Sequence, residues 1–194
     1  YLGVDVGVNA GVARSDGYLG KSLRPALGRA QQKRAEQRRQ GHVKSARRTA
    51  CKQLLDREAR RIVSVCQSTG QSLAIERLNT LANLKPTGSI GGWARLHLGK
   101  RVQELAELTG VTVVEVWPAG TSMTCPVCQY RDKKNRSGIS FRCLSCGHMA
   151  HADLVAAGAI ADRARVAFSG KQEGHVKSSH LRMIPLPISE DGGR

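Results

Sequence analysis

Aromatic side chains are scarce in this chain of 194 residues, where Phe, Trp and Tyr together make up 4%. No apolar run is long enough to span a bilayer and no signal peptide is present, so the sequence predicts neither a membrane protein nor an exported one. A hydrophobic content of 40% still suffices for one α/β domain with a small appendage. The chain opens on Tyr1, already in a predicted strand, and we therefore expect preceding domains of a longer protein to be missing.

Negative charge is the second scarcity, because 15 Asp and Glu face 31 Lys and Arg, a net charge of +16. Fourteen of the basic residues lie between Lys21 and Arg61, where only three acidic residues oppose them. A block of one sign at this density favours a phosphate backbone as partner. An anionic membrane surface is the alternative, but the block lacks the bulky apolar face which that would need. The residues that we predict to bind nucleic acid are Arg38, Arg39, Lys44, Arg47, Arg48, Lys52 and Arg77.

Four of the six cysteines form two CxxC pairs, Cys125 with Cys128 and Cys143 with Cys146, separated by fourteen residues. Without an export signal this pattern indicates a metal site and not disulfides. The spacing is typical of a zinc ribbon, in which four thiolates close a tetrahedron around one structural Zn²⁺. A redox CxxC is the alternative reading. His148 could replace one thiolate as ligand, but the four cysteines already fill the coordination shell. Cys51 and Cys66 fall in a helical pattern and are predicted to be small buried residues.

The order of hydrophobic patterns predicts an α/β fold with a mixed sheet, flanking helices and one inserted module. Glycines and prolines separate the predicted elements, and the residues from 169 to 194 show little periodicity, which predicts a disordered tail. The predicted strands cover residues 2–8, 11–15, 72–76 and 111–117, and the predicted helices cover 44–66, 93–108 and 152–168.

Three carboxylates stand where such patterns begin or end. Asp5 lies inside an apolar strand, Glu76 closes another, and Asp153 opens the last helix. Taken singly, each has an ordinary explanation: Asp5 or Glu76 facing water, Asp153 capping exposed N–H groups. Taken together, they suit hard divalent cations, which prefer oxygen ligands on rigid elements. Two such ions can activate a water and stabilise the leaving oxygen in phosphodiester cleavage.

The chain resembles the RuvC-like nuclease domain with zinc ribbon of the OrfB/TnpB insertion-sequence proteins and the related type V CRISPR effectors. The matching runs are GVDVGVNAG, REARRIV, LAIERLN, WPAGTSMTCPVCQ, FRCLSCGH and HADLVAA, in this order over residues 1–165. The resemblance implies an RNase H-like fold, with a catalytic triad of Asp5, Glu76 and Asp153 that holds two Mg²⁺. It also implies a zinc ribbon built on Cys125, Cys128, Cys143 and Cys146.

On this resemblance, residues 1–120 are the nuclease core with the first two acidic motifs, and 121–150 are the ribbon. Residues 151–168 are the last helix with the third motif, and 169–194 are the tail. The implied function is a metal-dependent DNA endonuclease domain guided by RNA, working in the cytoplasm of a prokaryote near the nucleoid. Its expected partners are target DNA, guide RNA and the missing N-terminal domains. A guided module that binds DNA and cuts weakly, and a transposase that joins strands, are the alternatives.

Two residues near Asp153 bear on the third acidic motif. Val155 stands where many relatives carry Asn. His151 precedes Asp153 by two residues, and either contacts substrate or lines the loop.

Overall fold

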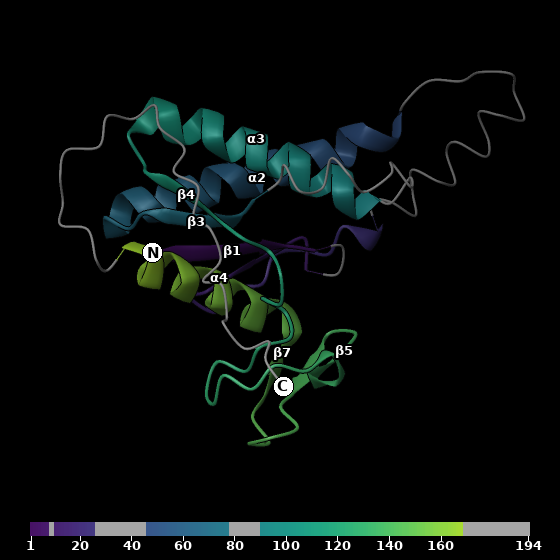
Figure 1. The fold of residues 1–194 in the computed structure, drawn as a ribbon. Helices are drawn as coiled ribbons and strands as arrows, with labels where there is room; N and C mark the ends of the chain where they lie inside the picture. The colour runs from purple at the N-terminus through teal and green to yellow at the C-terminus, as the bar shows by residue number, and fades with distance from the viewer. Residues whose placement is uncertain (8–9, 26–45, 78–89, 169–194) are drawn as a thin grey trace, which may run out of the picture.

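The computed structural model describes residues 1–7, 10–25, 46–77 and 90–168, and for 46–50 and 90–93 it describes the backbone alone. Its main sheet has four strands in the order β2-β1-β3-β4 (Figure 1). β1 is antiparallel to β2 and parallel to β3, and β3 is parallel to β4, so the sheet is mixed as predicted. These strands are β1 Leu2–Val6, β2 Val12–Arg14, β3 Leu73–Glu76 and β4 Val113–Val116.

Helices cover both faces of this sheet (Figure 1). Helices α2 (Ala46–Thr69) and α3 (Ile90–Thr109) pack on one face, over the larger apolar core. Helix α4 (Ala152–Phe168) packs on the other face, over a smaller core. None of the helices among the described residues is long and apolar enough to cross a membrane.

Helix α2 follows from its apolar spacing, since Cys51, Leu55, Ala59, Ile62 and Cys66 are all at most 1% exposed. The two cysteines are therefore buried core residues, as predicted. The helix ends because the next residue, a glycine, adopts φ +65°, and the chain then turns back with a 3.1 Å hydrogen bond to the Cys66 carbonyl. Residues 8, 44 and 45 of the predicted elements, and the predicted tail 169–194, lie outside the described residues.

Strand alternation decides which side chains of β1 meet which helix. Leu2 and Val4 belong to the core under α2 and α3. Gly3 and Asp5 point the other way, toward α4. A Cβ built on Gly3 would lie 2.1 Å from the backbone oxygen of Ala157 and 2.6 Å from the backbone nitrogen of Ala161. Helix α4 therefore crosses β1 at a distance that only a glycine permits.

The cysteine-rich insertion forms a sheet of its own, in the order β5-β6-β7. It consists of a 3₁₀ turn, η2 (Lys133–Asn135), followed by β5 (Arg136–Ser137), β6 (Ser140–Arg142) and β7 (Met149–His151). Strand β7 runs directly into α4, so the insertion is attached to the first turn of that helix.

Replacing Gly3 with Ala is expected to destabilise the protein by about 3 kcal/mol or more, because the new methyl group meets backbone atoms that cannot move aside. Chemical denaturation followed by circular dichroism measures the change. Gly158→Ala in α4 is the control: a Cβ there meets nothing within 4 Å, so a neutral result or a gain of about 1 kcal/mol is expected. Equal stability of Gly3→Ala and Gly158→Ala would contradict the close crossing.

Candidate functional site

Two of the three predicted carboxylates lie side by side on neighbouring parallel strands. In the register of β1 and β3, Gly3 pairs with Ala74 and Val4 with Ile75. The next position places Asp5 beside Glu76, and alternation turns both toward the α4 face of the sheet.

Asp153 reaches the same corner from α4. This residue is 3% exposed, and a Cβ on Gly7, just past the end of β1, would lie 3.5 Å from its Oδ2. The helix N-terminus, which carries partial positive charge, thus lies at the carboxyl edge of the parallel strands. The structure therefore brings Asp5, Glu76 and Asp153 to one corner of the sheet, from three elements.

The charges at this corner act on Asp5 most strongly. Burial most of all, and then the neighbouring carboxylates of Glu76 and Asp153, raise the pKa of Asp5 to about 7, against the lowering effect of Arg95 and Arg136. Asp5 is itself only 7% exposed, so it does not face water as the ordinary explanation of its sequence position required. Negative charge collected in so little solvent suits a bound cation.

Neighbouring side chains hold the other two carboxylates. Thr121 Oγ1 donates to Glu76 Oε1 at 2.6 Å, and Arg136 donates to Asp153 Oδ1 at 2.8 Å. The second oxygen, Asp153 Oδ2, is buried without a hydrogen-bond partner among the described residues. Among the described residues, the group of side chains close enough to hold a metal ion as they stand is the four cysteines, and these three carboxylates are not such a group. An orphaned, buried carboxylate oxygen beside two further acids nonetheless fits a divalent-cation site.

His151, and not the Asp153 side chain, accepts a hydrogen bond from a backbone N–H at the start of α4. Its Nδ1 accepts a 3.3 Å hydrogen bond from the Asp153 backbone N–H at the start of α4. The Asp153 carboxylate instead points to Arg136. The Asp153 carboxylate therefore does not cap the helix, and it lies at the acidic corner.

Three supporting residues were missed by sequence reasoning: Thr121, Arg136 and Arg163. Arg163 of α4 donates from Nη1 to the Trp117 carbonyl and from Nη2, at 2.7 Å, to the Ala119 carbonyl. It thereby fixes the loop that presents Thr121 to Glu76. Nothing in their local sequence pattern marks these residues, since each acts across a long stretch of chain.

Glu115 of β4 is buried, 6% exposed, on the α3 side of the sheet. Gln103 donates to it at 3.1 Å. Burial raises the pKa of Glu115, while the charge of Arg77 and the hydrogen bond from Gln103 lower it. Arg77 is thus the basic neighbour of Glu115. Its predicted contact with nucleic acid stays a prediction.

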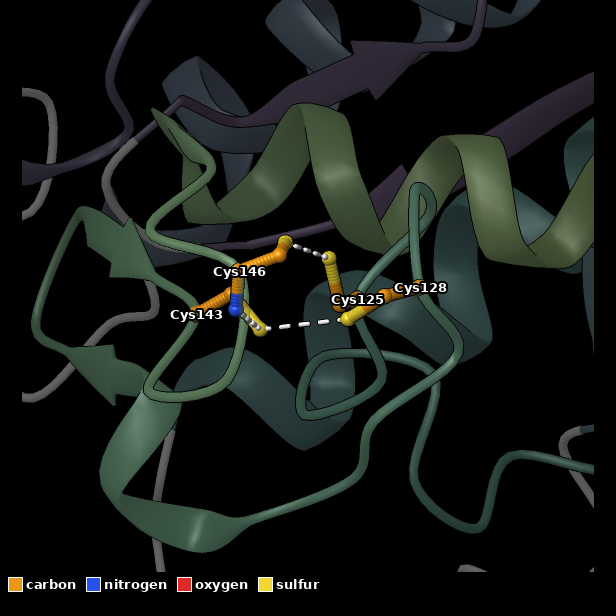
Figure 2. Close-up of side chains that lie close together, drawn as sticks. All are labelled: Cys125, Cys128, Cys143 and Cys146. Atoms are coloured by element: carbon orange, nitrogen blue, oxygen red, sulfur yellow. Dashed lines mark hydrogen bonds between the residues drawn. The ribbon is translucent and has the colours of Figure 1, made fainter.

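The four cysteine side chains of the ribbon point toward one another from two loops (Figure 2). Cys125 Sγ lies 3.6 Å from Cys146 Sγ, and Cys128 Sγ lies 3.5 Å from Cys143 Sγ. All four sulfurs lie within 4.8 Å of one another. A tetrahedron with Zn–S bonds of about 2.3 Å separates its sulfurs by about 3.8 Å, so the cluster is compatible with a zinc ribbon.

The surroundings of the cluster favour the thiolate form of Cys143 and disfavour that of Cys146, whose pKa the neighbouring thiols raise. Burial opposes ionisation of Cys143, but backbone N–H groups of Cys146 and Ser145 and the neighbouring thiols lower its pKa to about 7. Asn135, 1% exposed, ties the two loops together: it donates to the Met123 carbonyl at 3.0 Å and accepts from the Leu144 N–H at 3.0 Å. The site has four thiols and no open position, which is typical of structural zinc.

The ribbon packs onto the start of α4. Phe141, Cys125 and Cys143 form one buried cluster with Ala152 and Val155. Val155, the departure from the family pattern, is therefore a packing residue, 4% exposed. The order of the ribbon and the position of Asp153 consequently depend on one another.

The predicted nucleic-acid-binding residues are described only in part. Arg38, Arg39 and Lys44 lie outside the described residues, and of Arg47 and Arg48 only the helical backbone is described. Lys52 is exposed on α2 and Arg77 is half-buried after β3.

Comparison with known proteins agrees with this geometry. The Cas12f1-like TNB domain family matches residues 97–160, which include the ribbon and the first half of α4. The chain is 33% identical over 94 residues to the CRISPR-associated endodeoxyribonuclease Cas12f1 of Syntrophomonas palmitatica, and 34% identical over 88 residues to that of Sulfoacidibacillus thermotolerans. The resemblance to type V CRISPR effector nucleases is confirmed.

Solved Cas12 structures share the fold. A cryo-EM structure of a Cas12f1–sgRNA–target DNA complex matches 82% of this chain with a TM-score of 0.61 and 21% identity. CasPhi-2 (Cas12j) bound to crRNA matches 67% of it with a TM-score of 0.50 and 28% identity. The matches cover 19% and 21% of the two Cas12f1 sequences, and 48% and 22% of the two solved chains.

The pKa of Asp5 sets a pH dependence that a substitution can isolate. With a pKa of about 7 when folded, against 3.8 ordinarily, the native carboxyl holds a proton between pH 4 and 7 that the unfolded one releases. Stability of the metal-free protein therefore falls by about 4 kcal/mol as the pH rises through this window, then levels off.

Asp5→Asn removes this titration. The free energy of unfolding of the variant, relative to that of the wild type, is therefore expected to rise by about 4 kcal/mol between pH 4 and pH 8. Urea denaturation in EDTA at several pH values measures the difference. Added Mg²⁺ is expected to stabilise the wild type more than Asp5→Asn at pH 8. If the stabilities of the two proteins changed with pH in parallel, the surroundings of Asp5 would not raise its pKa.

One zinc ion per chain is expected by elemental analysis. Cys125→Ser removes a buried ligand, and is expected to lower the zinc content below half an ion and to unfold the ribbon. Cys51→Ser also changes a buried cysteine, but one in α2, and is expected to retain the metal. A full zinc content in Cys125→Ser, or none in the wild type, would refute the site.

Proposed function

We propose that this chain is the nuclease region of an RNA-guided DNA endonuclease, with an RNase H-like (RuvC) core, in which Asp5, Glu76 and Asp153 hold two catalytic Mg²⁺. The observation that carries the proposal is the meeting of three acidic residues at one buried corner, with the pKa of Asp5 raised by burial and by the other two carboxylates. The named relatives Cas12f1 are endodeoxyribonucleases, which supports the same chemistry here.

Each residue has a defined task in this proposal. Asp5 and Glu76 offer carboxylates from rigid, adjacent strands, and Asp153 offers its unpartnered Oδ2 from α4. Thr121 orients Glu76, and Arg136 fixes the other oxygen of Asp153. When bound, Mg²⁺ activates a water and stabilises the leaving oxygen in phosphodiester hydrolysis. No side-chain nucleophile is required.

The proposed division of labour follows the predicted domains. Residues 1–120 and 151–168 form the nuclease core, and residues 121–150 form a zinc ribbon that borders the entrance for single-stranded DNA. Further N-terminal domains of the same effector would hold the guide RNA and its target. The complexes with sgRNA, crRNA and target DNA among the structural relatives support these partners. A prokaryotic cytoplasm is the matching location.

Cleavage of a labelled 30-nucleotide single-stranded DNA with Mg²⁺ tests the proposal. Asp5→Ala, Glu76→Ala and Asp153→Ala are each expected to reduce the rate by about 10³-fold, because each removes a ligand from ions that supply several kcal/mol of transition-state stabilisation. Glu107→Ala removes an exposed acid from α3 and is expected to keep the wild-type rate.

Equal rates for the wild type and Asp5→Ala would remove the catalytic assignment and leave a guided DNA-binding module. Joined strands among the products, in place of free ends, would indicate a strand-transfer enzyme.

A further inference from the structure

A polar cleft of about 410 Å³ lies between α2 and α3, on the layer that does not carry the acidic corner. Two residues of α2, Lys52 and Asp56, line one side, and four residues of α3 line the other: His97, Lys100, Arg101 and Glu104. Five of these six carry a formal charge. The cleft is thus built for a polar ligand and not for an apolar one.

The acidic groups of the cleft are already paired within it. Asp56 Oδ1 lies 2.8 Å from His97 Nε2, and Glu104 Oε2 accepts from Arg101 Nη1 at 2.8 Å. Lys52 and Lys100 are exposed. With His97 counted as neutral, three cations and two carboxylates line the cleft, a net charge of +1, and Lys52 and Lys100 are the two cations that form no ion pair among the described residues. Such point charges on flexible stems suit phosphate groups.

Along α3, the lining of the cleft begins two residues after a contact with the edge of the acidic corner. Arg95, two residues before His97 on α3, donates to the Val6 carbonyl at 2.9 Å, immediately after Asp5 in β1. One helix, about 10 Å across, therefore separates the rim of the acidic corner from the cleft. Phosphates that follow one another at about 3.4 Å along a stacked strand cover this width in three to four nucleotides.

We propose that the α2–α3 cleft binds the phosphodiester backbone of the DNA strand a few nucleotides from the point of cleavage. This rests on the proposed nuclease function for the strand's identity, while the phosphate site itself rests on the cleft. The strand bends from the α4 side of the sheet edge, past Arg95, to Lys52 and Lys100. The cleft thus gives the enzyme a grip on substrate that is independent of the metal ligands.

Binding of a fluorescein-labelled 30-nucleotide oligothymidylate to the full 194-residue chain in EDTA, followed by anisotropy, tests the phosphate site. Lys52→Glu/Lys100→Glu is expected to raise Kd by about 10-fold and to reduce the slope of log K against log salt by about 1.4, the value for two phosphate contacts on a single strand. Lys52→Arg/Lys100→Arg retains the charges and is expected to restore the binding. Unchanged thermal unfolding and zinc content would show that the charge-reversed protein is folded.

A matched single pair provides the control. Lys100→Glu and Arg165→Glu reverse one charge each at exposed helical positions, but Arg165 lies in the last turn of α4, near Phe168, whose ring packs on Tyr1 at the start of β1. Only Lys100→Glu is expected to weaken binding more than 2-fold. A Kd for Lys52→Glu/Lys100→Glu within 2-fold of Arg165→Glu would overturn the site. A greater loss for a 30-nucleotide oligouridylate than for the DNA would assign the cleft to RNA and overturn the proposal.

The path of the strand is tested by cleavage of DNA of two lengths with Mg²⁺. The ratio of kcat/KM for a 30-nucleotide strand to that for a 6-nucleotide strand is expected to fall about 10-fold in Lys52→Glu/Lys100→Glu. The fall is expected because KM for the longer strand rises. An unchanged ratio would show that the cleft does not hold the strand being cut. If the wild type cleaves neither strand, the proposed function fails, and the anisotropy experiment still decides whether the cleft binds phosphate.

Discussion

The burial of Asp5 next to two other carboxylates is the constraint around which this structure is arranged. Asp5 is held in a nearly solvent-free position beside Glu76 and Asp153, which raises its pKa to about 7, burial being the largest cause. Such an arrangement costs stability unless cations offset it. Arg95 and Arg136 supply part of that compensation from α3 and from the ribbon. A bound divalent ion would supply the rest, which links the burial of Asp5 to the proposed chemistry.

The ribbon and the acidic corner are linked by direct side-chain contacts. Two of the clustered cysteines pack with Phe141 against the first turn of α4, and Arg136 of β5 reaches Asp153 in that same turn. A change in the metal state of the cysteines would therefore be transmitted to a carboxylate that is not a ligand of that metal. This coupling runs through packed side chains and one ion pair, and needs no large motion.

Charge is distributed unevenly over the two helical layers. The α4 layer borders the acidic corner, and the α2–α3 layer presents lysines around a polar cleft. The sheet between them carries Glu115 and Arg77 on the α3 side, where a buried acid and a base offset each other's charge. A nucleic acid that met both layers would have its reacting phosphate near the acids and its flanking phosphates near the lysines.

The sequence by itself determined the order of elements, because periodicity of 2 and of 3.6 depends only on local side-chain spacing. It likewise indicated the cysteine cluster, whose ligand spacing is local, and singled out Asp5, Glu76 and Asp153 as acids out of place in their elements. The helices at α2, α3 and α4 and the mixed sheet follow those predictions closely: the ends of the strands differ by at most two residues and the ends of the helices by at most three.

Only the tertiary structure decided which of these groups meet. The pairing of Gly3 with Ala74 puts Asp5 beside Glu76, and the approach of α4 to Gly3 brings Asp153 to the same corner. It also turned Glu115 inward, and gave Thr121, Arg136 and Arg163 their tasks at positions with no local signal. Register and helix approach arise from packing between segments far apart in the chain, and a pattern read along the chain contains no information on that packing.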